Sequence, residues 1–139
     1  MTKKGWIGIQ GQVTSKGFRN QIPTKAGVYI LSSHLPNGKP KEIGRAARID
    51  KNGILYIGEA TNLNERLGAL RQTLMETYEA EPHTAGRRYN QIKSMRKRFP
   101  KGTLRVTYKV VKTHKASESK LLSEYEQTYG ELPPLNRMN

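Results

Sequence analysis

The chain has 139 residues, carries 25 Lys and Arg against 11 Asp and Glu for a formal net charge of +14, and contains no cysteine. The length predicts one domain, the charge favours a polyanionic partner, and the absence of cysteine excludes disulfides and thiolate metal sites. No segment has the continuous apolar run of a signal peptide or a membrane span, so a cytoplasmic protein without a membrane partner is expected.

Residues 1–25 are polar and rich in Gly, Lys and Gln, which predicts an N-terminal arm with one candidate strand at Trp6–Ile9. The domain itself is expected over 26–139. It opens with AGVYILSS at 26–33, a run rich in strand-forming residues.

Two Asn-Gly pairs mark turns on either side of a long connection. Asn37 and Gly38 follow the first strand, and Asn52 and Gly53 precede a second one, ILYIG. The two strands are therefore predicted to pair antiparallel, with 34–52 as the connection between them.

From Asn62 the apolar residues recur at helical spacing, and Glu65 completes a capping-box pattern, so a helix is predicted from Asn62 to about Tyr78. A second helix is expected over GRRYNQIKSMRKRF, residues 86–99. A strand follows at 103–112, where apolar and polar residues alternate, and a last helix at Ala116–Tyr129. The order β-β-α-α-β-α predicts an α+β fold with a three-stranded antiparallel sheet flanked by helices.

A dense run of positive charge lies on the second predicted helix and just after it. A charged run is often only a solvated face, but with the global excess of charge it favours contact with nucleic-acid phosphates. Its members are Arg87, Arg88, Lys93, Arg96, Lys97, Arg98 and Lys101.

Hydrolysis of a phosphodiester needs a base, a cation to hold the phosphate and a carboxylate to fix a divalent metal. The sequence has no P-loop, no His-Glu-x-x-His and no paired acidic cluster of the two-metal kind. Its three histidines are scattered, and His34 and His83 are expected in exposed loops, from which either could assist proton transfer.

Four segments resemble the GIY-YIG endonuclease family, in the order in which that family carries them. Gly27-Val28-Tyr29 and Tyr56-Ile57-Gly58 resemble its two tripeptides, and NLNERL at 62–67 resembles its arginine segment. LLSEYEQTYGELPPLN at 121–136 resembles its closing segment, in which a glutamate on a helix precedes an asparagine. Together the matches cover residues 22 to 136.

The resemblance implies the family's fold and a metal-dependent hydrolysis of DNA, in a small stand-alone member from a restriction system, phage or mobile element of a bacterial or archaeal cell. It makes Tyr29 the general base, lets Tyr56 orient the water or phosphate, and gives Arg66 the scissile phosphate. Glu124 would hold one Mg²⁺ or Mn²⁺, and Asn136 would support the site. A double-strand cut would require a homodimer or sequential nicking.

The chain departs from the family at three positions. The two tyrosines are 27 residues apart, Glu59 stands where many members have lysine, and Leu70 stands where some have a tyrosine or histidine. His83, Tyr78 or Tyr89 are candidates to replace the side chain missing at position 70.

These departures keep two other functions open: a non-cleaving nucleic-acid-binding module, and a ribonuclease or single-strand-specific nuclease.

Each site residue also has a structural explanation. Tyr29 and Tyr56 could be core aromatics of the sheet, and Arg66 could be a solvated helix residue. Glu124 could pair with Lys120 four residues before it, while Glu118 and Glu126 are competing carboxylates on the same helix. The glycines of the two tripeptides could serve a tight turn or close packing in either case.

Overall fold

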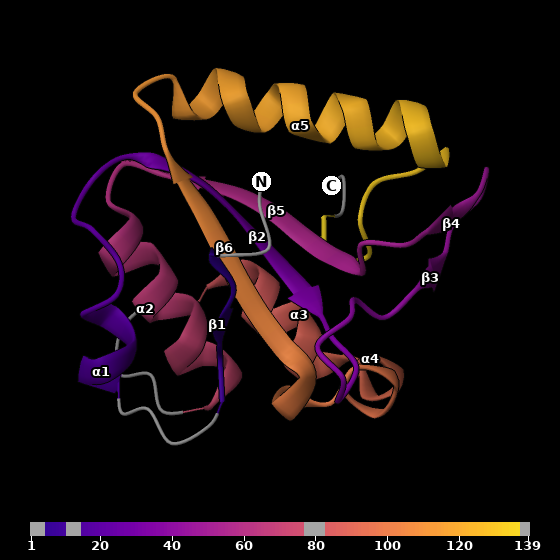
Figure 1. Cartoon of the computed structure of the whole chain (residues 1–139), viewed down its shortest axis with the longest axis horizontal. Coiled ribbons are helices and arrows are strands. Elements are labelled where there is room, and N and C mark those ends of the chain that lie inside the picture. The colour runs from indigo at the N-terminus through magenta and orange to yellow at the C-terminus, as the bar shows by residue number, and fades with distance from the viewer. Residues whose placement is uncertain (1–4, 11–14, 77–82, 137–139) are drawn as a thin grey trace.

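The computed structural model describes residues 5–10, 15–76 and 83–136 and has an α+β fold. Within these residues the main sheet has four antiparallel strands in the order β1-β6-β2-β5 (Figure 1). They are β1 (Ile7–Gly8), β2 (Gly27–Ser33), β5 (Ile54–Ala60) and β6 (Leu104–Val110). The α+β class and the antiparallel pairing of β2 with β5 are confirmed. The prediction of three strands is wrong, because β1 adds a fourth on the outer side of β6.

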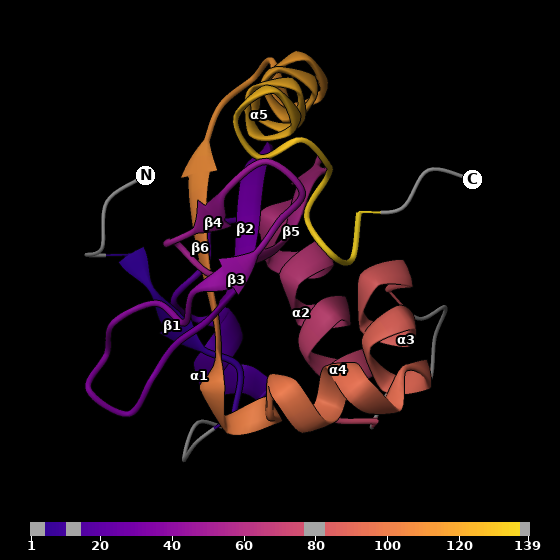
Figure 2. The ribbon, with the colours of Figure 1, turned by 90° about the vertical axis from the view of Figure 1, so that its right-hand side faces the viewer.

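The helices cover both faces of this sheet. The α5 helix lies along one face, and α2 and α3 lie on the other (Figures 1 and 2). None of the described helices is both long and apolar enough to cross a bilayer. The bounds are α1 (Ser15–Arg19), α2 (Leu63–Leu74), α3 (Thr84–Gln91), α4 (Lys93–Arg98), the short 3-10 helix η2 (Lys101–Thr103) and α5 (His114–Tyr129).

Alternate residues of β2 build the two halves of the core. Tyr29 and Leu31 are buried in the larger cluster, on the α2 face of the sheet. Ile30 lies in the smaller cluster, with Ile57 and Tyr125 of α5. This period-two division is what an internal strand between two helical layers requires.

The segment predicted as an arm is part of the packed domain where it is described. Ile9, Phe18 and Ile22 are all buried in the larger core cluster, and Ile7 pairs with Val106 of β6. A few apolar residues are enough to hold this polar segment against the domain, because Ile9, Phe18 and Ile22 are enclosed by the sheet and the helices.

The second predicted helix is broken into α3 and α4 at Ile92, whose backbone is extended at φ −104° and ψ 103°. The break lets Tyr89 and Phe99 enter the same core cluster. The hydroxyl of Tyr89 donates to the carbonyl of Phe99 at 2.6 Å. In one straight helix these residues would be about 15 Å apart along the axis, at 1.5 Å per residue.

The connection 34–52 forms a small two-stranded sheet, β3 (Ile43–Gly44) and β4 (Ile49–Asp50). The carboxylate of Asp50 is fully buried and accepts hydrogen bonds from the N–H groups of Asn52 and Ile54 and from the hydroxyl of Tyr125. This carboxylate joins the turn before β5 to α5, and so helps to fix α5 over the sheet.

Candidate active site

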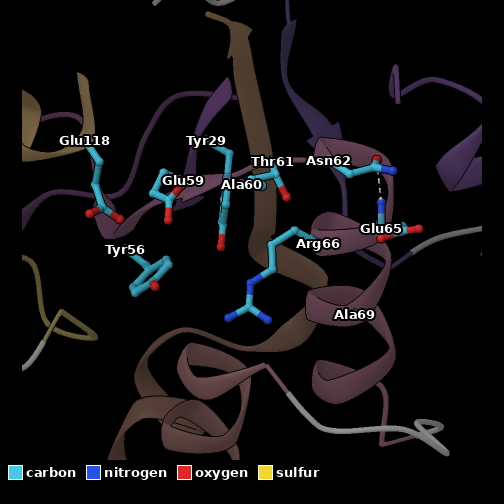
Figure 3. A pocket seen from close by; sticks show the side chains of 10 residues that line it. All are labelled: Tyr29, Tyr56, Glu59, Ala60, Thr61, Asn62, Glu65, Arg66, Ala69 and Glu118. Carbon is cyan, nitrogen blue, oxygen red and sulfur yellow. Dashed lines mark hydrogen bonds between the residues drawn. The ribbon is translucent and has the colours of Figure 1, made fainter. Parts of the chain in front are cut away.

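An open cleft of about 500 Å³ lies between the N-terminal half of α2, the end of β5 and α5. Figure 3 shows the Arg66 guanidinium and the Tyr29 hydroxyl inside it, with the carboxylates of Glu59 and Glu118 on the side away from α2. The lining residues are Tyr29, Tyr56, Glu59, Ala60, Thr61, Asn62, Glu65, Arg66, Ala69 and Glu118. The structure thus brings together three of the five residues predicted to be catalytic.

The two tyrosines meet because of the strand register. Tyr29 of β2 lies opposite Gly58 of β5, and Tyr56 is two residues before Gly58 on β5. Both rings therefore lie on one face of the sheet, with their centroids 6.0 Å apart. A Cβ on Gly58 would lie 2.5 Å from Cζ of Tyr29 and 2.7 Å from a ring carbon of Tyr56. The glycine of the second tripeptide therefore leaves room for the tyrosine pair, which is close packing rather than a turn.

Tyr29 is buried to 1% exposure, with its hydroxyl at the cleft. Burial raises the pKa of this phenol well above its ordinary value, the neighbouring Tyr56 raises it further, and the Arg66 guanidinium lowers it in part. A phenolate here needs positive charge or hydrogen-bond donors beside it. Arg66 is one such group within the cleft.

Arg66 is placed by a well-formed helix start. The side chain of Asn62 caps α2 by accepting from the N–H of Glu65 at 3.2 Å, as predicted, and the carbonyl of Asn62 accepts from the N–H of Arg66. Leu63, Leu67 and Leu70 of the same helix are fully buried. The buried stripe and the cap together turn Arg66 toward the cleft.

The third aromatic ring at this site is His83, which was expected in an exposed loop and is instead fully buried at the N-cap of α3. Its Nε2 lies 2.6 Å from the Tyr29 hydroxyl, and its ring centroid is 5.5 Å from that of Tyr56. Burial lowers the pKa of His83 to about 3, helped by Arg66, so the ring is neutral at physiological pH. His83 thus lies beside Tyr29, whereas Leu70 is buried in the core.

Three glutamates line the cleft, with Glu65 of α2 on one side and Glu59 and Glu118 together on the other (Figure 3). Glu118 comes from α5, and burial together with the negative charge of Glu59 raises its pKa. Glu59 comes from β5 and is hydrogen-bonded to Nδ1 of His114 at the start of α5. The two negative carboxylates of Glu59 and Glu118 repel each other. A hard divalent cation between them would offset this repulsion and find the oxygen ligands that it prefers.

Glu124, the predicted metal ligand, is not at this cleft. Its side chain is 61% exposed, and its carboxylate lies 4.0 Å from the Lys120 ammonium. This is the ion pair with Lys120 that the four-residue spacing allows. It lines a different pocket on α5, with Val28 and Lys109. Glu118, and not Glu124, is the carboxylate of α5 that lines the cleft with Tyr29, Tyr56 and Arg66.

Asn136, predicted among the catalytic residues, is also outside the cleft and pairs with the edge of the sheet. Its side-chain oxygen accepts from the N–H of Ile57 at 2.8 Å, and its amide donates to the carbonyl of Ile57 at 2.8 Å. The N–H of Leu135 donates to the carbonyl of Leu55. Asn136 thus holds the segment that follows α5 against β5, next to Tyr56.

Of the other candidates considered for position 70, Tyr89 is buried in the core and donates to Phe99, so it does not face the cleft. Tyr78 lies outside the described residues. His34 is buried rather than exposed, with Nδ1 against the carbonyl of Gly38 at 3.1 Å.

The predicted phosphate-binding cations lie on α3, α4 and η2. Lys101 pairs with Glu76 at 3.3 Å. Arg88 donates to the carbonyl of Leu135 at 2.7 Å. Burial raises the pKa of Tyr56, and the charge of Arg88 offsets a small part of this rise. The other five are exposed: Arg87, Lys93, Arg96, Lys97 and Arg98.

Within the described residues there is no group of three or more His, Cys, Asp or Glu side chains arranged to hold a metal ion. A cation at this cleft would be held by Glu118 and Glu59, with water and substrate oxygens completing its shell, as Mg²⁺ commonly is. The residues present fit such an ion, since their carboxylates face the same cleft as Arg66 and Tyr29.

Comparison of the chain with protein-family models, with curated proteins and with solved structures finds no match.

Proposed function

We propose that this protein is a metal-dependent endonuclease that hydrolyses phosphodiester bonds in DNA, with the fold and mechanism of the GIY-YIG family. The observation that carries the proposal is that Tyr29, Tyr56, Arg66 and the carboxylate of Glu118 line one open cleft. A hydroxyl, a guanidinium and a carboxylate are the groups that phosphodiester hydrolysis needs.

Arg66 holds the scissile phosphate, because its planar fork can donate to two phosphate oxygens at once. Tyr29, as the phenolate, takes a proton from the attacking water as the water oxygen bonds to phosphorus. The bridging P–O bond breaks on the opposite side, and the leaving oxygen receives a proton from solvent. Tyr56 orients the water or the phosphate through its hydroxyl.

Glu118, with Glu59 beside it, takes the role that the resemblance implies for Glu124. A divalent cation held there would draw a phosphate oxygen toward the cleft and offset the charge that develops on it. Glu59 is tied to His114, which fixes the carboxylate in position. The lysine that many family members carry at position 59 is thereby replaced by a second acidic group.

The positive charge of the protein favours DNA as its partner. The chain carries a formal +14, and five cations of α3 and α4 are exposed. Contacts of this kind hold the backbone of a nucleic acid without reading its sequence. A nick in one strand needs one copy of the protein, and a double-strand cut needs a homodimer or two successive nicks.

The test incubates supercoiled plasmid with the wild type at low salt, in Mg²⁺, Mn²⁺ or EDTA, beside Arg66→Gln and the control Arg48→Gln, which changes an exposed arginine outside the cleft. Metal-dependent nicking or linearisation is expected, with a loss of about a hundredfold or more in Arg66→Gln and none in Arg48→Gln. Equal activity of the two variants would refute the role of Arg66.

Single-stranded DNA and RNA are offered in the same assay. Preferential cutting of either one would show that it, and not duplex DNA, is the substrate. Tight binding with no cutting of any of the three would identify a binding module instead of a nuclease.

A further inference from the structure

The hydrogen bonds around His83 fix which of its ring nitrogens carries the proton. The N–H of Ala85 donates to Nδ1 at 3.1 Å, so Nδ1 has no hydrogen of its own. A neutral imidazole then has its hydrogen on Nε2. Since Nε2 lies 2.6 Å from the Tyr29 hydroxyl oxygen, His83 is the donor in that contact and Tyr29 is the acceptor.

The backbone around His83 is held as firmly as its ring. The N–H of His83 donates to the hydroxyl of Thr73 on α2 at 2.9 Å, and that hydroxyl donates to the carbonyl of Ala69 at 2.8 Å. The side chain is fully buried. The donor therefore cannot turn away from Tyr29 without disturbing both α2 and the start of α3.

We propose that His83 is a positioning residue of the nuclease site, whose Nε2–H donates to the Tyr29 oxygen and holds it for proton transfer with the water or phosphate in the cleft. This role rests on the proposed function. It makes His83 a hydrogen-bond donor and excludes it as the general base. The neutral ring has one lone pair able to accept a proton, on Nδ1, and this lone pair already accepts from the N–H of Ala85.

Two consequences follow for Tyr29. As a phenol it uses a lone pair for His83, which leaves its own hydrogen to point elsewhere. As a phenolate it accepts from His83 while the Arg66 guanidinium lies in the same cleft, so a buried negative charge has a donor and a cation beside it. The low pKa of His83, about 3, keeps this donor neutral across the physiological range.

A matched pair of variants separates this role from the helix cap. An Asn side chain reaches the position of Nδ1, so His83→Asn keeps an acceptor for Ala85 and loses the donor to Tyr29. A Gln side chain reaches the position of Nε2, so His83→Gln keeps a donor for Tyr29 and loses the cap. Thermal unfolding and kcat and KM for DNA cleavage are measured for both.

The expected result is that His83→Asn unfolds close to the wild-type temperature, because Asn is a favoured cap, but loses about ten- to a hundredfold in kcat with KM little changed. His83→Gln is expected to unfold a few degrees lower and to retain most of kcat. A purely structural residue would give the reverse order. Wild-type kcat in His83→Asn, or equal losses in the two variants, would overturn the proposal.

A second measurement needs no cleavage. Two-bond ¹H–¹⁵N correlations of the ¹⁵N-labelled protein report which nitrogen of His83 is protonated. Hydrogen on Nε2 alone from pH 5 to 8, with a shifted Nε2–H resonance in Tyr29→Phe, is expected. Hydrogen on Nδ1 would overturn the inference about His83 but not the proposed function. A wild type that cuts no nucleic acid refutes the proposed function, and the kinetic part of this inference with it.

Discussion

Substituting Gly58 by Ala should damage both stability and the site, because the added methyl group enters the space of the two tyrosines. The new Cβ would lie 2.5 Å from Cζ of Tyr29, about 0.9 Å closer than the 3.4 Å at which ordinary contact begins. Tyr29 is 1% exposed and lies on β2, between β5 and β6. The ring can therefore move by that distance only by pushing against the residues packed around it.

Overpacking of this kind costs about 1–3 kcal/mol, and the better strand preference of Ala over Gly returns about 0.5–1 kcal/mol. At the middle of these ranges the net loss is about 1 kcal/mol, which corresponds to a fall of about 3–5 °C in the unfolding temperature of a domain of this size. A displacement near 1 Å at a reacting group also predicts a loss of about a hundredfold in cleavage.

Calorimetry and plasmid cleavage test this substitution beside Gly44→Ala. A Cβ on Gly44 meets nothing within 4 Å, so that control should change stability by less than about 0.5 kcal/mol. If Gly58→Ala unfolds and cleaves like the control, the argument that Gly58 exists to admit the tyrosine pair is refuted.

Three further predictions concern α5 and the charged surface. Tyr125→Phe removes one of the donors to the buried Asp50 carboxylate and should lower the free energy of unfolding by about 1–2 kcal/mol; an unchanged denaturation midpoint would contradict this. The pKa of Glu118 is raised in the folded state by burial and by Glu59, so its contribution to stability falls as pH rises above the ordinary glutamate value toward that raised pKa. Glu118→Gln in EDTA should therefore be at least as stable as the wild type at pH 8, with a smaller difference at pH 4; destabilisation confined to pH 8 would be the opposite result. Replacing the four exposed cations of α4 by Gln should reduce the slope of log binding constant against log salt by about 0.9 for each phosphate of duplex DNA that the protein no longer neutralises; fluorescence anisotropy with an unchanged slope would exclude this face. Those cations are Lys93, Arg96, Lys97 and Arg98.

The sequence predicted the parts of the site that follow from local pattern. Tyr29 and Tyr56 lie on neighbouring strands because two strand-like runs, each beside a turn signal, pair antiparallel. Arg66 follows from the Asn62 cap and the helical spacing of the leucines. In each case the local signal and the tertiary arrangement agree, so a pattern of a few residues was sufficient.

The choice of carboxylate on α5 could not be made in this way. Glu118 and Glu124 are six residues apart, which at 3.6 residues per turn places them about 120° from each other around the helix. Only one of them can face the cleft, and the face is set by packing of α5 through Tyr125 onto Ile30 and Ile57. The spacing from Glu124 to Asn136 carried no information about that packing.

For His83 the sequence predicts only an exposed loop between two helices. Its burial depends on α3 docking onto α2 through Thr73, and its function depends on a contact with Tyr29, 54 residues away in the sequence. The candidate strand at Trp6–Ile9 is confirmed in part by β1 (Ile7–Gly8), but its pairing with β6 was not predicted. These features arise from contacts between distant segments, on which local sequence has little influence.

The most direct test of the proposed site compares Glu118→Gln with Glu124→Gln in the Mg²⁺-dependent cleavage of plasmid DNA. Both changes remove one carboxylate charge from the same helix, and the side chain of Glu124 is largely exposed and away from the cleft. Loss of cleavage in Glu118→Gln, with folding and DNA binding retained and Glu124→Gln active, is the predicted result. Loss in Glu124→Gln with Glu118→Gln active would contradict the assignment of Glu118 to the site.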